Sequence, residues 1–309
     1  MLPWVVWRLV AATPTLLGVV AVAFALLYVM PGDPVRLLVS SFQGEGSREQ
    51  IEEIRTRLGL NDPILVQFGR YVVDVARGDL GTSILKSRPV GALIRDALPH
   101  TLELAGLAVV IATTLGMTVG VVSAVARGTW IDRTSVFVAL LGVSAPDFWM
   151  AMLAVLVFAV KLRWFPAFGI GGFTFLILPA AVIGIRTSAA VTRLTRSSML
   201  EVLSRQYVTT ARAKGLGELS VIAVHALRNA LIPVVTLLGL ECGRLIGGAV
   251  VVETVFARQG IGSLLVGSIL DKDLPVLRGT VLVVALGYIL LNLIIDLSYG
   301  WFDPRIRVR

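Results

Sequence analysis

Six long apolar runs dominate this sequence, and each is close to the roughly 20 residues that a helix needs to cross a membrane. They cover residues 9–30, 104–126, 134–160, 164–185, 229–252 and 279–295. Hydrophobic residues make up 56% of the chain and charged residues only 16%, whereas soluble domains are roughly 25% charged. The first run is too long for the core of a signal peptide and five others follow it, so we expect it to be retained. The sequence therefore predicts an all-α polytopic membrane protein with six transmembrane helices.

The positively charged residues fall on one side of this arrangement. With six spans, both ends of the chain lie on the same side, together with the loop at Arg127 and the segment 193–228. These parts hold twelve Lys and Arg against four acids, whereas the segment 31–99 holds nine of each. Because cytoplasmic loops are rich in Lys and Arg, the N- and C-termini are predicted to be cytoplasmic. The positive excess then faces the cytoplasm, which argues against nucleic acid as its partner.

The segment 31–99 is predicted to be a small external cap built from helices. A capping box at residues 47–50 predicts one helix. A second helix is expected to start at Pro63 and to end before Gly78, and a third to cover 90–98. The cap either only covers the helix bundle or forms a docking surface for an external partner.

The cytoplasmic segment 193–228 has the pattern of two helices joined by a tight turn. Leu203 and Tyr207 recur at helical spacing, and Gly215-Leu216-Gly217 then interrupts the helix. A second amphipathic helix over 221–231 leads into the fifth apolar run. Such a basic hairpin either lies on anionic lipid or projects from the membrane as a knob that contacts a partner.

Four charged residues lie within the predicted spans or directly at the end of one, where each costs roughly 2.5–3.5 kcal/mol on insertion scales. Glu241 and Arg244 are three residues apart, so they share one face of the fifth helix and can neutralise each other. Asp147 interrupts the third run, and Arg186 belongs to the fourth helix. Each is interpreted either as a structural or interfacial charge or as part of a polar path through the membrane.

Two ridges of glycine occur at four-residue spacing. One consists of Gly239, Gly243 and Gly247 in the fifth run, and the other of Gly116 and Gly120 in the second. Small residues at this spacing let helix backbones approach closely. Both ridges are predicted to be packing sites, within the bundle or against a second subunit.

The sequence lacks the residues that several other functions require. Cys242 is the single cysteine, and together with His100 and His225 it cannot build a structural zinc site. No Gly-x4-Gly-Lys-Ser/Thr pattern occurs, so the chain cannot cradle the phosphates of ATP itself. The serine, paired-aspartate and His-Glu-x-x-His patterns of intramembrane proteases are missing. No internal repeat supports a self-contained secondary transporter.

Short motifs occur in order along nearly the whole chain. They lie at residues 30–34, 58–63, 78–83, 98–102, 144–149, 211–216, 225–233, 248–256 and 292–307. Together they resemble the inner-membrane permease subunits of bacterial dipeptide and oligopeptide ABC importers, the DppB/OppB type. The chain departs from the general importer pattern Glu-Ala-Ala-x3-Gly-x9-Ile-x-Leu-Pro, with which only Ala211, Gly215 and Leu227 agree. It also has Gln259 where the family usually has proline.

This resemblance implies a type I ABC importer permease with a first helix in residues 1–30, the external cap in 31–99 and a five-helix core in 100–309. The core would include a coupling segment, 193–231, that seats in a groove on an ATPase subunit. The coupling residues so implied are Thr210, Ala211, Ala213, Lys214, Gly215, Leu216 and Gly217. The candidates for docking a binding protein are Gly78, Asp79, Gly81, Thr82 and Ser83. The candidates for the translocation path are Asp147, Arg186, Glu241 and Arg244, because the ends of a peptide need counter-charges.

The resemblance also implies that the chain is a non-catalytic transport subunit that binds no cofactor and no metal itself. ATP and Mg would be held by two partner ATPase subunits. The complex would further contain a homologous second permease subunit and an extracytoplasmic substrate-binding protein, in the bacterial inner membrane. Dipeptides or oligopeptides are the expected cargo, with haem, glutathione or a nickel chelate as alternatives. A self-contained secondary transporter is a remote alternative.

Overall fold

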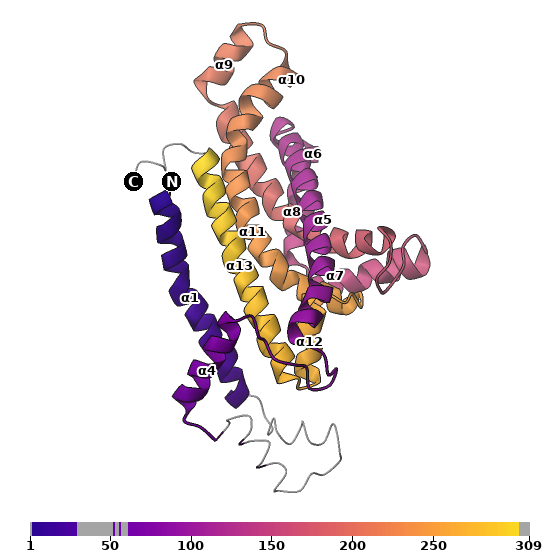
Figure 1. Cartoon of the computed structure of the whole chain (residues 1–309). Coiled ribbons are helices and arrows are strands. Elements are labelled where there is room, and N and C mark those ends of the chain that lie inside the picture. The colour runs from indigo at the N-terminus through magenta and orange to yellow at the C-terminus, as the bar shows by residue number, and fades with distance from the viewer. Residues whose placement is uncertain (1, 30–51, 53–55, 57–60, 303–309) are drawn as a thin grey trace. The chain divides into compact units, whose positions relative to one another are not determined.

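The computed structural model describes residues 2–29, 52, 56 and 61–302, and the described chain is built from helices with one isolated antiparallel bridge between Thr82 and Pro89 (Figure 1). The predicted all-α class is therefore confirmed. The helices are α1 Leu2–Val29, α4 Ile64–Ala76, α5 Val90–Val125, α6 Trp130–Ser144, α7 Asp147–Ala154, the π-helix η1 Val155–Lys161, α8 Thr174–Leu203, α9 Gln206–Ala213, α10 Glu218–Ser220, the π-helix η2 Val221–Ala226, α11 Leu227–Val255, α12 Ile261–Leu270 and α13 Leu274–Phe302.

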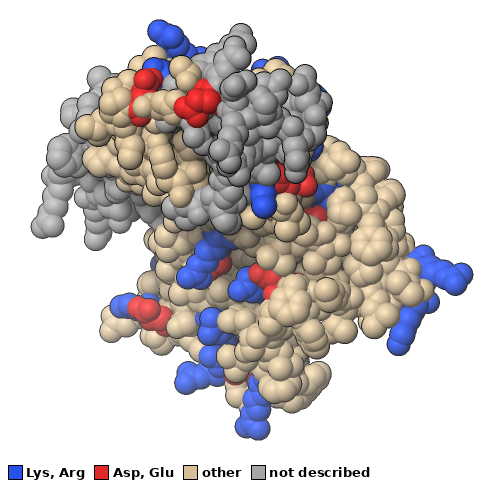
Figure 2. Space-filling view, turned by 90° about the horizontal axis from the view of Figure 1, so that it is seen from below, with Lys and Arg blue, Asp and Glu red and all other residues tan. Residues whose placement is uncertain are grey.

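A helix lies at each of the six predicted membrane spans. Four helical stretches of the described residues are long and apolar enough to cross a membrane alone: Val90–Val125, Thr174–Leu203, Glu218–Leu245 and Leu274–Ile295. The bent pair of α6 with α7 and η1 is a fifth candidate. The first predicted span corresponds to α1, whose described apolar part is Thr13–Tyr28. Figure 2 shows a face on which uncharged residues cover most of the surface and basic side chains lie beside acidic ones at several places.

Two predicted spans differ from the structure in shape or position. The third run is not one straight helix, because α6 and the helix that follows it meet at 106°. Ala145 is extended (φ −81°, ψ 132°) and Pro146 has no N–H to donate, so the helix stops before the proline. The fourth run was expected to be helical from residue 164, but α8 begins only at Thr174. Residues 164–173 form a non-helical loop in which Gly169 takes the left-handed conformation, with φ +103°.

The cap and the cytoplasmic segment also differ from their predicted helices in detail. The second cap helix is confirmed as α4, which starts one residue after Pro63. The third is not a separate short helix, because α5 runs on without a break from Val90 through Pro99. The expected helix after the capping box at 47–50 lies outside the described residues. In the segment predicted to be cytoplasmic, α8 extends to Leu203, and the break at residues 204–205 separates it from α9.

The described chain divides into two compact units, and the first comprises Met1–Pro99 and Ser263–Leu290. Its apolar core joins Val20 and Ala23 of α1 to Leu282 of α13, with Phe68 and Val72 of α4 packed against them. The loop after α4 is held by polar contacts as well. The Ser83 hydroxyl donates to the Asp273 carboxylate, and the Ile84 N–H donates to the same side chain at 3.3 Å. The described part of the cap is thus a packed structure and not a loose linker.

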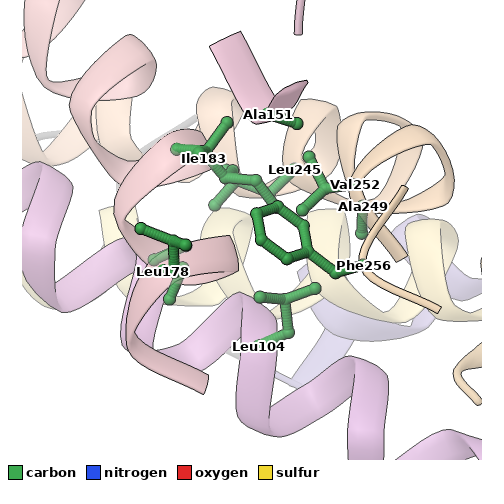
Figure 3. Packing of buried hydrophobic residues seen from close by; sticks show 11 residues of the cluster. Leu104, Ala151, Leu178, Ile183, Leu245, Ala249, Val252 and Phe256 are labelled. Atoms are coloured by element: carbon green, nitrogen blue, oxygen red, sulfur yellow. The ribbon is translucent and has the colours of Figure 1, made fainter. Parts of the chain in front are cut away.

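The second unit comprises His100–Gly262 and Leu291–Arg309, and its main core lies where α5, α7, α8 and α11 meet. Figure 3 shows the ring of Phe256 surrounded by aliphatic side chains from these helices, among them Leu104, Leu178 and Val252. All of these side chains are at least 95% buried. The core fixes the C-terminal end of α11 relative to α8, and it therefore determines where the charged residues of both helices lie.

The predicted glycine ridge on α5 is a packing site. A Cβ on Gly116 would lie 2.6 Å from the Val191 Cβ, and one on Gly120 would lie 2.6 Å from the Thr195 Cβ. The absence of a side chain therefore lets α5 and α8 approach closely. On α11, a Cβ on Gly239 would lie 2.6 Å from the Ile295 Cγ2, whereas Gly247 faces open space.

Candidate functional site

A cavity of about 130 Å³ lies in the second unit, between α7, α8 and α11. Its lining includes all four charged residues that the sequence placed within the spans, namely Asp147, Arg186, Glu241 and Arg244. Glu241 is the central residue of α11, with roughly 21 Å of helix on either side of it. The cavity therefore lies beside the middle of α11. We call it the charged cavity.

Asp147 and Arg186 form one ion pair in the charged cavity. The Arg186 Nη1 donates to the Asp147 Oδ2 at 2.9 Å, and the side chains are 46% and 18% exposed, respectively. Asp147 is the first residue of α7, directly after the bend at Pro146. A carboxylate at a helix N-terminus is stabilised by the helix dipole, so the bend itself favours the negative charge at this position.

Glu241 and Arg244 form the second pair, three residues apart on α11 as the sequence predicted. The Arg244 Nη1 donates to the Glu241 Oε1 at 3.1 Å. The two partners differ in environment, because the Arg244 side chain is 80% exposed and that of Glu241 only 11%. The carboxylate is therefore fixed by the surrounding helices, while the guanidinium extends away from them and can move.

Arg193 also lines the charged cavity, and the sequence analysis missed it. The sequence predicts Arg193 as the first residue of the cytoplasmic segment, yet α8 continues ten residues beyond it to Leu203. Arg193 follows Arg186 by seven residues, which is close to two helical turns and places both on one face of α8. The seven-residue spacing of the two arginines was the signal in the sequence that they lie on the same face of one helix.

The predicted coupling segment forms a knob beyond the ends of α8 and α11 (Figure 1). A small core of Val208, Ala211 and Val221 joins α9 to η2. Arg212 closes the turn, since its Nε donates to the Glu218 Oε1 at 2.7 Å, and this hydrogen bond raises the pKa of the Arg212 guanidinium. Of the seven predicted coupling residues Ala211 is buried, whereas Thr210, Ala213, Lys214, Gly215, Leu216 and Gly217 are exposed.

Gly215 occupies the turn between α9 and α10 in the left-handed conformation, with φ +80°. A Cβ built there meets nothing within 4 Å, so a side chain would not clash with the chain itself. The requirement for glycine at this position within the chain is therefore conformational, because other residues adopt a positive φ only at a cost. The neighbouring Gly217 has an ordinary φ of −63°.

The predicted docking residues lie in the turn after α4, in the first unit. Gly78 and Gly81 both have positive φ, and the Gly81 N–H donates to the Asp79 Oδ1 at 2.8 Å. Gly78, Asp79, Gly81 and Thr82 are exposed. Ser83 is only 3% exposed, because its hydroxyl is directed inward to Asp273. Four of the five candidates can therefore be reached from outside the unit.

A second charged cluster, which the sequence analysis also missed, surrounds Glu253 at the C-terminal end of α11. Glu253 is completely buried, and its carboxylate accepts hydrogen bonds from the Thr101 hydroxyl at 2.6 Å and from the Gly262 N–H at 2.8 Å. The Thr101 Oγ1 in turn accepts the Ile261 N–H at 2.8 Å. Arg258, which is 2% exposed, lies close by. We call this group the Glu253 cluster.

The Glu253 cluster fixes the turn that connects α11 to α12. Cβ atoms on Gly260 and Gly262 would lie 2.2 Å from the Glu253 Cδ and 2.4 Å from the Val250 Cα, respectively. The backbone of the turn therefore packs directly on the carboxylate and on α11. The signal in the sequence was an acidic residue, Glu253, directly after an apolar run, followed by Gly260-Ile261-Gly262. Both belong to motifs of the resemblance, but the pattern alone does not show that they form a buried cluster.

A third charged contact ties α8 to the turn between α5 and α6. The Arg196 guanidinium binds the Asp132 carboxylate through two hydrogen bonds, of 2.6 and 2.8 Å. Asp132 is 4% exposed and also accepts from the Ser123 hydroxyl at 2.6 Å and from the Gly128 N–H at 3.0 Å. Because α8 leads directly into α9, this contact holds the base of the knob to the rest of the unit.

Comparison with known proteins identifies the family. Residues 116–308 match the family described as the inner membrane component of binding-protein-dependent transport systems, and residues 1–105 match its N-terminal region. The dipeptide transport system permease protein DppB of Alkalihalophilus pseudofirmus is 40% identical, over 99% of this chain and all of the relative. The glutathione transport system permease protein GsiC of Salmonella paratyphi A is 41% identical over the full length of both chains.

A solved structure shares the fold. The MetNI methionine ABC transporter, in inward-facing conformations, contains a chain that aligns with a TM-score of 0.59 at 17% identity, covering 68% of this chain and 96% of that one. At this level of identity the likeness concerns the fold alone. The sequence matches, in contrast, extend over both units and include the motifs that suggested the resemblance. The chain belongs to the family of inner membrane components of binding-protein-dependent transport systems.

Proposed function

We propose that this chain is one membrane-spanning permease subunit of an ATP-driven peptide importer, and that it forms half of the translocation path. One observation carries the proposal: two of the helices that line the charged cavity, α8 and α11, also hold the knob. α8 contributes Arg186 and Arg193 and leads into α9, and α11 contributes Glu241 and Arg244 and begins directly after η2. A movement of the knob is thereby transmitted to the cavity through continuous helices.

The partners in this proposal are a homologous second permease subunit, two ATPase subunits that bind ATP and Mg, and an extracytoplasmic substrate-binding protein. The knob is the surface for the ATPase, because its core is internal while Lys214 and Leu216 are exposed, and Leu219 beside them is 82% exposed. The turn at Gly78–Asp79 is the surface for the binding protein. With the knob in the cytoplasm, both termini of the chain are cytoplasmic as well.

Closure of the ATPases on ATP is expected to shift the knob and to change access to the charged cavity from one side of the membrane to the other. The Arg196–Asp132 contact supports this mechanism, because it makes the last turns of α8 move together with the α5–α6 turn. The close packing of α5 on α8 at Gly116 and Gly120 has the same effect along the helix. The chain supplies the path, and its partners supply the energy.

Dipeptides or short oligopeptides are the proposed cargo, on the strength of the likeness to the dipeptide permease. Glutathione is the second candidate, since an equally similar relative is a glutathione permease. Glutathione is itself a modified tripeptide, so both readings require a cavity that accepts charged ends. The choice between them depends on the binding protein that delivers the cargo.

The proposal is tested by purifying the tagged chain in mild detergent and identifying the proteins that accompany it, followed by uptake assays in proteoliposomes. We expect two ATPases, a second permease and peptide uptake that depends on ATP and on the binding protein. Recovery of the intact chain alone, with peptide uptake driven by an ion gradient and without ATP, would instead identify a secondary transporter.

Coupling is tested in the same assay with Gly215→Val. This change should abolish uptake while the chain remains inserted, because the turn of the knob would have to leave its left-handed conformation. Gly169→Val is the matched control and should retain uptake, since Gly169 also has a positive φ, +103°, and a Cβ there meets only the Phe175 Cε1 at 3.9 Å. Normal uptake by the Gly215 variant would show that the knob does not couple ATP hydrolysis to transport.

A further inference from the structure

The charges of the cavity do not cancel. Its lining contains two carboxylates, Asp147 and Glu241, and three guanidinium groups. Arg186 and Arg244 each pair with one carboxylate. Arg193 is exposed, and within the described part of the chain it has neither an ion pair nor a hydrogen bond. The charged cavity therefore carries one excess positive charge, located on α8.

The excess charge selects the kind of group that the cavity can take. A guanidinium group at membrane depth faces either water or an anionic ligand, because its transfer into lipid is costly. Its planar fork of N–H donors matches a carboxylate, which it can bind through two parallel hydrogen bonds. An ammonium group fits less well, since both carboxylates are already paired and a cation would have to displace an arginine.

The size and position of the cavity limit the ligand further. About 130 Å³ has room for a carboxylate group together with bound waters. The cavity lies beside the central residue of α11 and on the face of α8 that carries Arg186. Arg186 is itself 46% exposed, so its free nitrogen atoms remain available for a second contact to the same anion.

We propose that the charged cavity is a carboxylate-binding subsite in which Arg193, assisted by Arg186, holds the C-terminal carboxylate of the peptide during its passage. This inference rests on the proposed function and deepens it, because it assigns one end of the substrate to named residues. Selectivity for a free C-terminus would then reside partly in the permease and not only in the binding protein.

The experiment compares uptake of alanyl-alanine with that of its C-terminal amide by the complete importer in proteoliposomes. The binding protein is saturated with each peptide, and the ratio of the two initial rates is measured for wild type, Arg193→Gln and Arg193→Lys. The contribution of the binding protein is the same in each case and cancels when the ratios are compared. The rate of ATP hydrolysis stimulated by the loaded binding protein is recorded in parallel.

Arg193→Gln is expected to lower uptake of the free acid roughly tenfold, because a site built to bind a charged group loses its charged partner. Uptake of the amide should change little, so that the acid-to-amide ratio falls, and Arg193→Lys should restore only part of the ratio, because lysine keeps the charge but not the planar fork of donors. Arg127→Gln is the matched control, since Arg127 is also an exposed arginine without an ion pair in the described chain but lies in the α5–α6 turn, away from the cavity.

Two results would overturn the inference. One is an unchanged acid-to-amide ratio in Arg193→Gln. The other is an equal loss for both peptides that depends on the content of anionic lipid, which would mean that Arg193 binds a lipid phosphate instead. Both are distinct from a failure of the proposed function, in which the wild-type complex itself would show no ATP-dependent uptake. The variant should fold normally, because Arg193 is exposed and makes no ion pair within the described chain.

Discussion

The second unit contains two groups of charged residues at different levels of α11, and they are built in opposite ways. In the Glu253 cluster the carboxylate is completely buried and accepts hydrogen bonds from a hydroxyl and a backbone N–H. In the charged cavity each carboxylate has one arginine partner, and the arginines are 46% and 80% exposed. A buried carboxylate that accepts hydrogen bonds holds a structure together, whereas exposed pairs with spare donors can exchange partners. The Glu253 cluster therefore has the properties of a rigid joint, and the charged cavity has those of a binding site.

The largest effect is expected from Gly262→Ala, which places a Cβ 2.4 Å from the Val250 backbone and 2.9 Å from the Glu253 carboxylate. The turn between α11 and α12 would have to leave its place, so little monodisperse protein should be recovered after extraction in detergent. Gly267→Ala in the same helix has open space around the new Cβ and should behave like wild type. Equal yields of the two variants would show that the joint is not rigid.

Glu253→Ala should have the next largest effect. It leaves the Thr101 hydroxyl and the Gly262 N–H buried without their acceptor, which corresponds to about 3 kcal/mol of lost stability. The midpoint of thermal unfolding in detergent measures the loss. Glu253→Gln retains one acceptor oxygen, but its side-chain N–H group then faces the N–H of Gly262. The unfolding midpoint of this variant should therefore fall between those of wild type and the alanine variant.

Asp132→Asn is expected to have an intermediate effect. The substitution removes the charge that binds Arg196 through two hydrogen bonds, and hydrogen bonds to charged groups are worth about 2 kcal/mol. Because the contact holds α8 to the α5–α6 turn, stimulation of ATP hydrolysis by the binding protein should become uncoupled from uptake. A variant that loses stability but keeps its ratio of transported peptide to hydrolysed ATP would restrict this contact to a structural role.

The smallest effect on stability is expected from Glu241→Gln combined with Arg244→Gln. The Arg244 side chain is 80% exposed, and exposed pairs contribute less than about 1 kcal/mol, so the unfolding midpoint should stay near that of wild type. Peptide uptake should nevertheless fall, because the cavity loses both charges. Unchanged uptake would remove this pair from the translocation path and leave it a packing contact.

The sequence predicted most of the helices, because apolar runs and charge asymmetry reflect transfer into lipid, which depends on composition. It did not predict where the run after Lys161 becomes helical, since residues 164–173 are as apolar in a loop as they would be in a helix. The bend before Asp147 had a local signal in Pro146, yet the length of the run outweighed it. Average hydropathy is insensitive to a single proline such as Pro146, although this residue divides one apolar run into two helices.

Each of the four predicted residues of the candidate site could be identified from the sequence, but their grouping in one cavity could not. Asp147, Arg186, Glu241 and Arg244 each stand out because charge is rare within a membrane span. That they share one cavity depends on the packing of α7, α8 and α11, which no local pattern contains. Glu253 was overlooked for the same reason, because an acidic residue near the end of an apolar run cannot be distinguished from a surface residue until its partners are known.

The bend of 106° between α6 and α7 has a consequence for the biogenesis of the chain. A half-helix such as α6, with 15 residues, is shorter than the bilayer core and ends in backbone groups that lipid cannot satisfy. The helices that α7 packs against, α8 and α11, are synthesised later. The bent segment can reach its final place only after residues up to Val255 have left the ribosome. Its placement is therefore a late step, and a chain arrested before α11 would present it to the quality-control proteases of the membrane.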